Sequence, residues 1–409
     1  MKKTLLAALC ASLVLAACSK TDTDTDAGPA VAPAETTDAA PAEQAASGPA
    51  QTPEEKSGNF PKPAPLVEMG QADTEQWVTS AGRTPDGKII VTEENFVVAE
   101  TDKYFAEHSE KIPINRIRHS REYSTVDNQV VIRENQDALY SHAVVDVSEG
   151  ATITNPEWAN YSIIQIMDEN QYSFAHLYPG ESITLTPDDL SFGNYVWLNI
   201  RTEVRPNSEE GWADAHRHQD AYIIDAKSAV PYPTKGFDRA SLDAVRSELL
   251  TQAAKVNSWE AFGTKDVVDP EQFIIAAAGG WAGLPREHAV YWPKFVPGPE
   301  ALEGACSQLT LKEPPLDFDK GGFFSATAYG PDAFIATENY ALSSRNAEAN
   351  PDGSVTFRFN CPGMANNIDT KKGAWNVTIR FYRPTDFPSM LAYIEAFEAD
   401  GTAIEVVKE

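Results

Sequence analysis

The sequence has few basic residues and none of the short motifs that mark common enzyme classes. It contains 33 Lys and Arg against 60 Asp and Glu, so its 409 residues carry a formal net charge of −27. Binding to nucleic acid through phosphate contacts needs the opposite charge, and we therefore expect no nucleic-acid partner. GxSxG, HExxH, CxxC, a Walker loop and a GxGxxG after a strand are all missing from the sequence. This weighs against nucleotide-binding, zinc-protease and serine-hydrolase functions, and the sequence leaves any cofactor unknown.

Long apolar runs are missing as well. The longest run near the N-terminus covers residues 5–17, which is too short for a membrane span of about 20 residues. It follows Lys2 and Lys3 and ends in small residues directly before Cys18, a pattern that predicts a signal peptide at residues 1–17 and lipidation of Cys18. An ordinary secretory signal with a chance cysteine is the alternative. We expect a lipid anchor in the bacterial cell envelope, in the outer membrane, with the protein facing the periplasm or the cell surface.

Residues 18–58 are rich in Ala, Pro, Thr and acidic residues and contain no aromatic side chain. Such a segment cannot bury enough apolar surface to fold. We expect the lipidated cysteine to be followed here by a disordered acidic tether.

Cysteine is rare, with four residues in the whole chain. Cys10 lies in the expected signal peptide and Cys18 is the expected lipid site, which leaves Cys306 and Cys361. In an oxidising compartment these two can form a disulfide, and two buried free thiols are the alternative.

The remainder has the composition of a folded protein, with 42% apolar and 10% aromatic residues. Residues 129–205 consist of short runs rich in Val, Ile, Tyr and Thr that turn residues separate, and similar runs resume near residue 309. Helical patterns lie between them. We predict an N-terminal β domain at residues 59–235, a helical connector at 236–300 and a C-terminal β domain at 301–409.

The first candidate site lies around the strand predicted at residues 139–147. Its two-residue period places Tyr140 and His142 on one face, opposite a face of small and aliphatic residues that is typical of a core. Asn135 and Asp137 come just before this strand, where they can project into a cavity. The alternative is that they form an Asx turn that starts the strand.

A second strand at residues 195–202 also divides into two faces. Trp197 and Arg201 share a face with Tyr195 and Asn199, and this combination of aromatic planes with amide and guanidinium donors suits sugars, carboxylates or small polar acids. The alternative is that helices pack over this face and that Arg201 is paired with an acidic residue.

In the C-terminal part, one face of the strand at residues 375–382 is aliphatic and aromatic, as expected for a core. The other face is polar, and we expect it to be solvated. Its members are Asn376, Thr378, Arg380 and Tyr382.

His216 and His218 form an H-x-H pair that could supply metal ligands. Their neighbours are typical of an exposed helix face, and we expect no metal site.

Several of these segments resemble a known pair of domains. Residues 135–141 with 145–147, 161–168 and 197–202 look like the family DUF 1254, and residues 280–285, 323–329, 352–355 and 375–384 are similar to its usual partner, DUF 1214. The chain departs from the family habit at Gln136, where Arg is common, and at Phe324, where Trp is common. The resemblance implies a mainly β protein with accessory helices, built from two β-sandwich domains of jelly-roll character in tandem. It implies little about chemistry, because both families are named for their unknown function.

Our leading hypothesis is an envelope lipoprotein that binds a small or polymeric polar ligand, such as a small molecule or a glycan, through pockets in its β domains. The candidate ligand-binding residues are Asn135, Asp137, Tyr140, His142, Trp197 and Arg201. The first alternative is a hydrolase in which Asp137 or His142 acts as general base on a substrate held by Arg201 and Tyr140. The second is a structural protein that contacts other envelope proteins.

Overall fold

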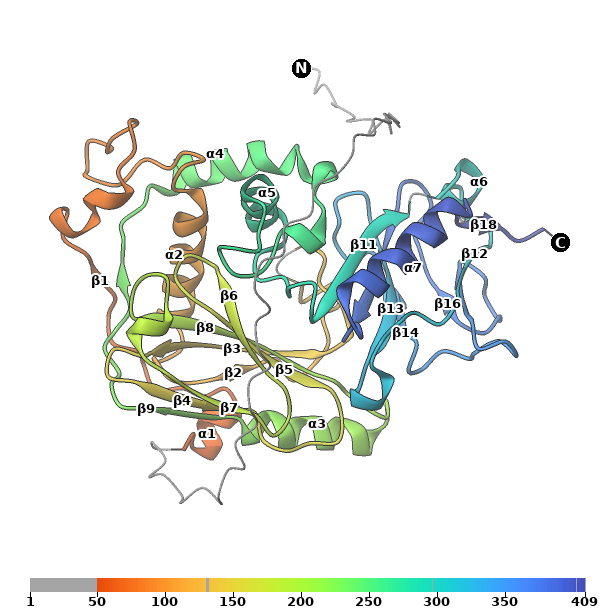
Figure 1. The fold of residues 1–409 in the computed structure, drawn as a ribbon, viewed down its shortest axis with the longest axis horizontal. Coiled ribbons are helices and arrows are strands. Elements are labelled where there is room, and N and C mark those ends of the chain that lie inside the picture. The colour runs from red at the N-terminus through yellow and green to blue at the C-terminus, as the bar shows by residue number, and fades with distance from the viewer. Residues whose placement is uncertain (1–49, 130–131, 296, 402, 409) are drawn as a thin grey trace, which may run out of the picture. The chain divides into compact units, whose positions relative to one another are not determined.

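The computed structural model describes residues 50–129, 132–295, 297–401 and 403–408. The expected signal peptide and Cys18 lie outside these residues. The described part is mostly β, with helices packed alongside the sheets (Figure 1). This agrees with the fold class expected from the sequence.

The N-terminal half contains two sheets of antiparallel strands. The larger has the order β2-β3-β8-β5-β6 and the smaller has the order β7-β4-β9. The bounds are β2 Arg118–His119, β3 Leu139–Asp146, β4 Ala151–Thr154, β5 Ser162–Met167, β6 Ser173–Leu177, β7 Ser182–Leu185, β8 Tyr195–Thr202 and β9 Ile223–Ala226.

One face of each strand builds the core between these two sheets. Val196, Leu198 and Ile200 of β8 join Val145 of β3 and Ile153 of β4 in one buried cluster. Burial of each such side chain contributes about 1.5–3 kcal/mol. The aliphatic faces predicted for β3 and β8 are thus confirmed, and their polar faces point away from this core.

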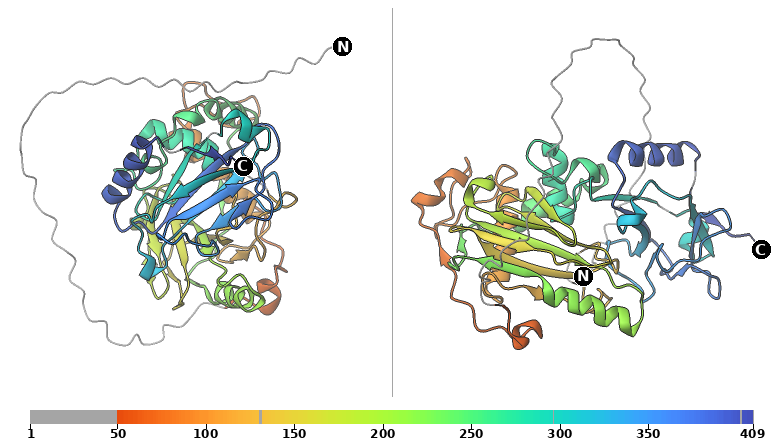
Figure 2. Two further views of the ribbon diagram at one scale, coloured as in Figure 1. Left: turned by 90° about the vertical axis from the view of Figure 1, so that its right-hand side faces the viewer. Right: turned by 60° about the horizontal axis from the view of Figure 1, so that its bottom comes forward.

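The C-terminal half also contains two sheets. Their orders are β11-β17-β13-β14 and β16-β15-β12-β18, and Figure 2 shows these strands, in turquoise to blue, beside those of the N-terminal half. Phe324, Phe357 and Ile379 belong to the core between them, which α7 covers with Met390. The bounds are β11 Ala289–Phe295, β12 Ser307–Leu311, β13 Phe323–Tyr329, β14 Ala341–Ser343, β15 Val355–Phe359, β16 Asn367–Ile368, β17 Asn376–Tyr382, α7 Phe387–Ala399 and β18 Glu405–Val406.

Strand β11 corrects the helical connector that we expected at residues 236–300. It pairs with β17 at the edge of the C-terminal sheet. Pro293 interrupts its sequence pattern, and proline is tolerated in a sheet mainly at such an edge. The connector is therefore helical only in its first part.

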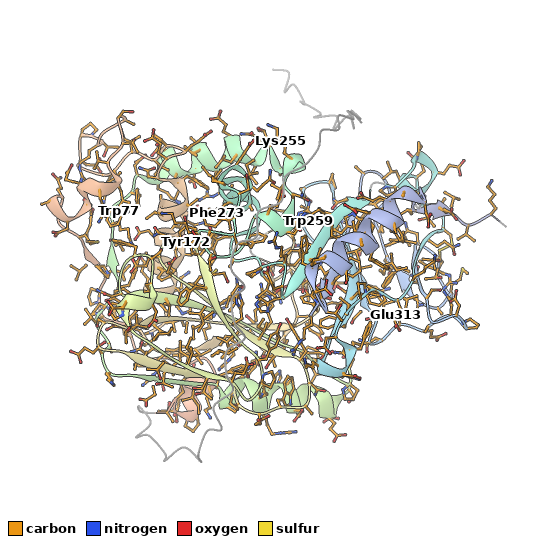
Figure 3. The ribbon with its side chains drawn as sticks, in the orientation of Figure 1. Trp77, Tyr172, Lys255, Trp259, Phe273 and Glu313 are labelled. Atoms are coloured by element: carbon orange, nitrogen blue, oxygen red, sulfur yellow. A yellow bond between two sulfur atoms is a disulfide. The ribbon has the colours of Figure 1, made fainter. Side chains whose placement is uncertain are left out.

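Three helices pack together above the larger N-terminal sheet (Figure 1). They are α2 (Phe96–Ser109), α4 (Arg239–Leu250) and α5 (Pro270–Gly280). Tyr172, in the turn between β5 and β6, stacks on Phe273 of α5 with ring centroids 5.3 Å apart (Figure 3). Helix α3 (Glu209–Ala221) lies on the opposite side of the sheets (Figure 1). These helices agree with the helical patterns in the sequence.

The last residues of the expected tether are folded. Helix α1 (Pro53–Lys56) begins with a capping box formed by Thr52 and Glu55, and Glu55 is buried in an ion pair with Arg116 (3.0 Å). The ion pair with Arg116 and the capping box thus order this short stretch despite its polar composition. The remaining short elements are β1 Val67–Glu68, η1 Ala72–Trp77, η2 Pro187–Asp189, β10 Pro233–Thr234, η3 Ala253–Lys255, η4 Ser258–Glu260, α6 Pro299–Leu302 and η5 Phe318–Lys320.

Cys306 and Cys361 form a disulfide beside the paired strands β12 and β15, with a sequence separation of 55 residues. Within the part of the chain that the structure describes, no helix combines the length and apolarity that crossing a membrane requires.

Candidate functional site

The polar face of the sheet β11-β17-β13-β14 is buried against the N-terminal domain. Five of its residues are at most 3% exposed, namely Ser325, Thr327, Thr378, Arg380 and Tyr382. Our expectation of a solvated face was wrong for these positions, because the polar groups find partners in the first domain. This face therefore forms one wall of a buried polar layer between the two domains.

The segment that precedes β3 crosses this layer. The side chain of Arg133 donates a hydrogen bond to Thr378 Oγ1 (2.8 Å), and Arg380 donates to the carbonyl oxygen of Arg133 (3.0 Å). Gln136 donates to the carbonyl oxygen of Ala341 (2.8 Å). These contacts hold residues 132–138 between the two sheets.

Asp137 links the two domains directly. One of its carboxylate oxygens accepts hydrogen bonds from Ser325 Oγ and from the Tyr382 hydroxyl, both at 2.9 Å. Burial raises the pKa of Asp137, although Arg380 and the two hydroxyl donors oppose this change. Asn135 Oδ1 accepts the backbone N–H of Asp137 (3.0 Å), so the Asx turn that we considered as an alternative is present.

Arg201 is buried on the opposite wall of the layer, with 5% of its surface exposed. Its guanidinium group donates to Gln165 Oε1 (2.9 Å) and to the carbonyl oxygen of Ala282 (3.2 Å), and it lies over the ring of Tyr140 at 5.5 Å. Tyr140 is its register partner on β3. No described Asp or Glu forms an ion pair with Arg201, so the acidic partner that we considered as an alternative is not found there.

Three tyrosines near this guanidinium group have hydroxyl protons without an acceptor in the described parts of the chain. The Tyr140 hydroxyl accepts a hydrogen bond from Asn135 Nδ2 (3.1 Å), and the Tyr291 hydroxyl accepts the backbone N–H of Leu284 (3.0 Å). Both can still donate their own protons. The Tyr161 hydroxyl is fully buried and has no partner among the described residues. Among the described residues, the layer therefore holds three hydroxyl donors without an acceptor, and one acceptor without a donor, Asn199 Oδ1.

Aromatic residues continue this wall along β3 and β8. The His142 ring lies 6.2 Å from the Tyr140 ring and 5.4 Å from the Trp197 ring. Burial lowers the pKa of His142 to about 4, assisted by the positive charges of Arg118 and Arg201. Trp197 packs against Phe105 of α2, so helices do cover this end of the face, as we considered in the alternative interpretation.

The structure thus brings the six candidate residues into one continuous set of contacts. Asp137 contacts Asn135, Asn135 contacts Tyr140, and Tyr140 lies between His142 and Arg201.

Sequence reasoning missed four neighbours from other segments: His108, Tyr161, Tyr291 and Tyr382. Helix α2 brings in His108, and Tyr291 and Tyr382 come from the C-terminal sheet. A period-two analysis of single strands gives no signal for such contacts.

Within the described ranges, no hydrogen bond joins Asp137 to His142, which the proposed hydrolase requires. Ser162 Oγ lies 3.0 Å from His218 Nε2, and both side chains are buried. His218 is buried too, so our expectation of an exposed H-x-H pair was wrong at this position. No group of three or more His, Cys, Asp or Glu among the described residues is placed to hold a metal ion.

Comparisons with known proteins agree with the two-part architecture. Residues 114–189 match the family described as "Protein of unknown function (DUF1254)", and residues 298–386 match "Protein of unknown function (DUF1214)". The sequence matches no curated protein.

Two solved structures are similar to this chain. The VPA0106 protein from Vibrio parahaemolyticus is 18% identical with a TM-score of 0.57, and the match covers 77% of this chain and 98% of that one. A putative uncharacterized protein from Burkholderia cenocepacia is 13% identical with a TM-score of 0.41, covering 71% of this chain and 84% of that one. At this identity the first likeness shows the fold alone.

The order of the two matched domains along the chain is the order that the resemblance implied. The chain therefore contains a segment that matches DUF1254, followed by a segment that matches DUF1214.

Proposed function

We propose that the protein binds a small anionic ligand, of the carboxylate class, in the polar layer between its two β domains, and that Arg201 anchors the anion. The observation that carries this proposal is a buried guanidinium group without an acidic partner among the described residues. Burial of an unpaired charge costs several kcal/mol, which a bound anion would offset.

The surrounding hydrogen-bond groups support an anion over a neutral ligand. Tyr140, Tyr161 and Tyr291 have free hydroxyl protons near Arg201, and a carboxylate supplies acceptors without donors. Hydrogen bonds to an ionised acceptor are about twice as strong as those between neutral groups. A donor-rich layer around a cation is thus suited to a carboxylate.

Solvent access supports a site at this position. Tyr140, His142 and Tyr291 keep part of their surface accessible, although sheets and loops of both domains surround them. A ligand would reach Arg201 along this accessible surface. The net charge of −27 disfavours large polyanions at the surface, so the proposal is restricted to small acids.

Titration calorimetry on the full chain would test this function. We expect acetate, propionate or benzoate to bind, and the neutral amides of the same acids to bind at least tenfold more weakly. Arg201→Met should abolish the binding of the acids. Arg217→Met, which removes an arginine that is 66% exposed on α3, should leave it unchanged.

Two results would contradict the proposal. One is equal binding of acids and amides, and the other is unchanged affinity of the acids for Arg201→Met.

We further propose that the protein is a lipid-anchored envelope protein. The basic start, the short apolar run and the small residues before Cys18 support this location. Labelling of cells with a radioactive fatty acid should mark the wild-type protein and leave Cys18→Ser unlabelled. Equal labelling of both would contradict the anchor.

A further inference from the structure

Two more buried nitrogen atoms lack hydrogen-bond partners, and one of them lies on the same face of β8 as Arg201. They are Trp197 Nε1 and His108 Nε2, which have no hydrogen bond among the described residues. The rings of Trp197 and His108 are 5.1 Å apart. A buried polar atom without a partner costs about 1–3 kcal/mol, so this pair marks a second place where a ligand would add hydrogen bonds.

This second place lies in line with Arg201. Trp197 and Arg201 belong to the same face of β8, because they are four residues apart on a strand. Their α-carbons are therefore about 13 Å apart at a rise of about 3.3 Å per residue. Asn199 lies between them on the same face, and its register partner His142 keeps part of its surface accessible, so a ligand with two polar ends would run past His142.

The charges around the second place also favour an anion. Burial lowers the pKa of His108 to about 3. Positive charge at His142, Arg118 and Lys111 acts in the same direction. The positive charges of Arg118 and Arg201 likewise lower the pKa of His142. No described carboxylate is among the groups that act on either ring, and Arg118 acts on both.

We propose that the ligand is an elongated dicarboxylate, with one carboxylate on Arg201 and the other on Trp197 Nε1 and His108 Nε2. This inference rests on the proposed function, because the first carboxylate uses the anion site at Arg201. It adds the class of ligand, namely linear acids with a charged group at each end.

Calorimetry with succinate, glutarate, adipate and pimelate would test the inference. The matched probes are their monomethyl esters, which keep the length and one carboxylate but lose the second charge. We expect one chain length to bind at least about tenfold more tightly as the diacid than as the half-ester. Trp197→Phe removes the N–H and keeps an aromatic ring, so it should reduce that diacid to the affinity of its half-ester and leave the half-ester unchanged.

Two further variants complete the experiment. His108→Leu should also lose part of the preference for the diacid. Trp212→Phe on α3 is the matched control, because Trp212 Nε1 already donates to Asn207 Oδ1 (3.1 Å), and it should change nothing.

Equal affinities for diacids and half-esters would overturn the inference, and so would a preference that both Trp197→Phe and His108→Leu leave intact. If the half-esters still bind and need Arg201, the proposed function stands while the dicarboxylate assignment falls. If no acid of either series binds, both are overturned.

Discussion

Replacing Arg201 with Met should change the stability of the ligand-free protein little, while it abolishes binding. Arg201 is a buried cation without an acidic partner among the described residues. Residues that serve binding often lower the stability of a fold, and their replacement then raises it.

Removal of the guanidinium group relieves a desolvation cost of several kcal/mol. It loses two charge-assisted hydrogen bonds worth about 1.5–3 kcal/mol each and a contact with the Tyr140 ring worth about 0.5–2 kcal/mol. Asn199 Nδ2 lies 3.5 Å from Gln165 Oε1 and 3.3 Å from the Ala282 carbonyl oxygen, so both acceptors keep a donor. The two sides nearly cancel, and we expect a change in the free energy of unfolding between about −1 and +2 kcal/mol.

A paired arginine provides the matched control. Arg345 forms an ion pair with buried Glu203 (3.0 Å) between the two domains. Arg345→Met would leave Glu203 without its cation, which should lower the free energy of unfolding by about 3–5 kcal/mol.

Urea unfolding at pH 7, followed by tryptophan fluorescence, measures both variants against the wild type. If Arg201→Met loses as much stability as Arg345→Met, then Arg201 is a structural cation with a compensating partner. The reasoning behind the anion site would then be refuted.

The remaining predictions concern the disulfide, a histidine and the link between the domains. Reduction of Cys306–Cys361 should destabilise the protein by about 4 kcal/mol, because it frees a loop of 55 residues in the unfolded chain, and urea unfolding with and without reductant would measure this loss. His142 has a folded-state pKa of about 4, below the unfolded value of about 6.5, so the stability that its neutral form contributes is lost as the pH falls from about 6.5 to about 4. This loss is at most about 3 kcal/mol, and melting temperatures across that range should fall less steeply for His142→Gln; parallel curves would contradict it. Asp137→Ala should cost about 2–4 kcal/mol in urea unfolding, because it leaves two buried hydroxyl donors without their acceptor, and a loss below 1 kcal/mol would argue against this link.

Periodicity along single strands was sufficient to predict much of this fold. The alternation of aliphatic and polar residues in β3 and β8 determines which face of each strand meets the core. Helical patterns between the two β regions also indicated helices there, and the structure shows Asp269 as the N-cap of α5, directly before Pro270. Strand β11 escaped prediction because Pro293 interrupts its pattern, and only pairing with β17 stabilises it there.

The sequence by itself determined which side chains share a face of a strand, because the two-residue period is a property of the local backbone. Asn135, Tyr140, His142 and Arg201 were therefore recognisable as a candidate set. Only the tertiary structure shows which groups lie opposite these side chains. The polar side of β17 covers the layer instead of meeting water, and Arg201 remains without an acidic partner in the described chain. Such facts depend on contacts between residues far apart in the chain, which no local pattern encodes.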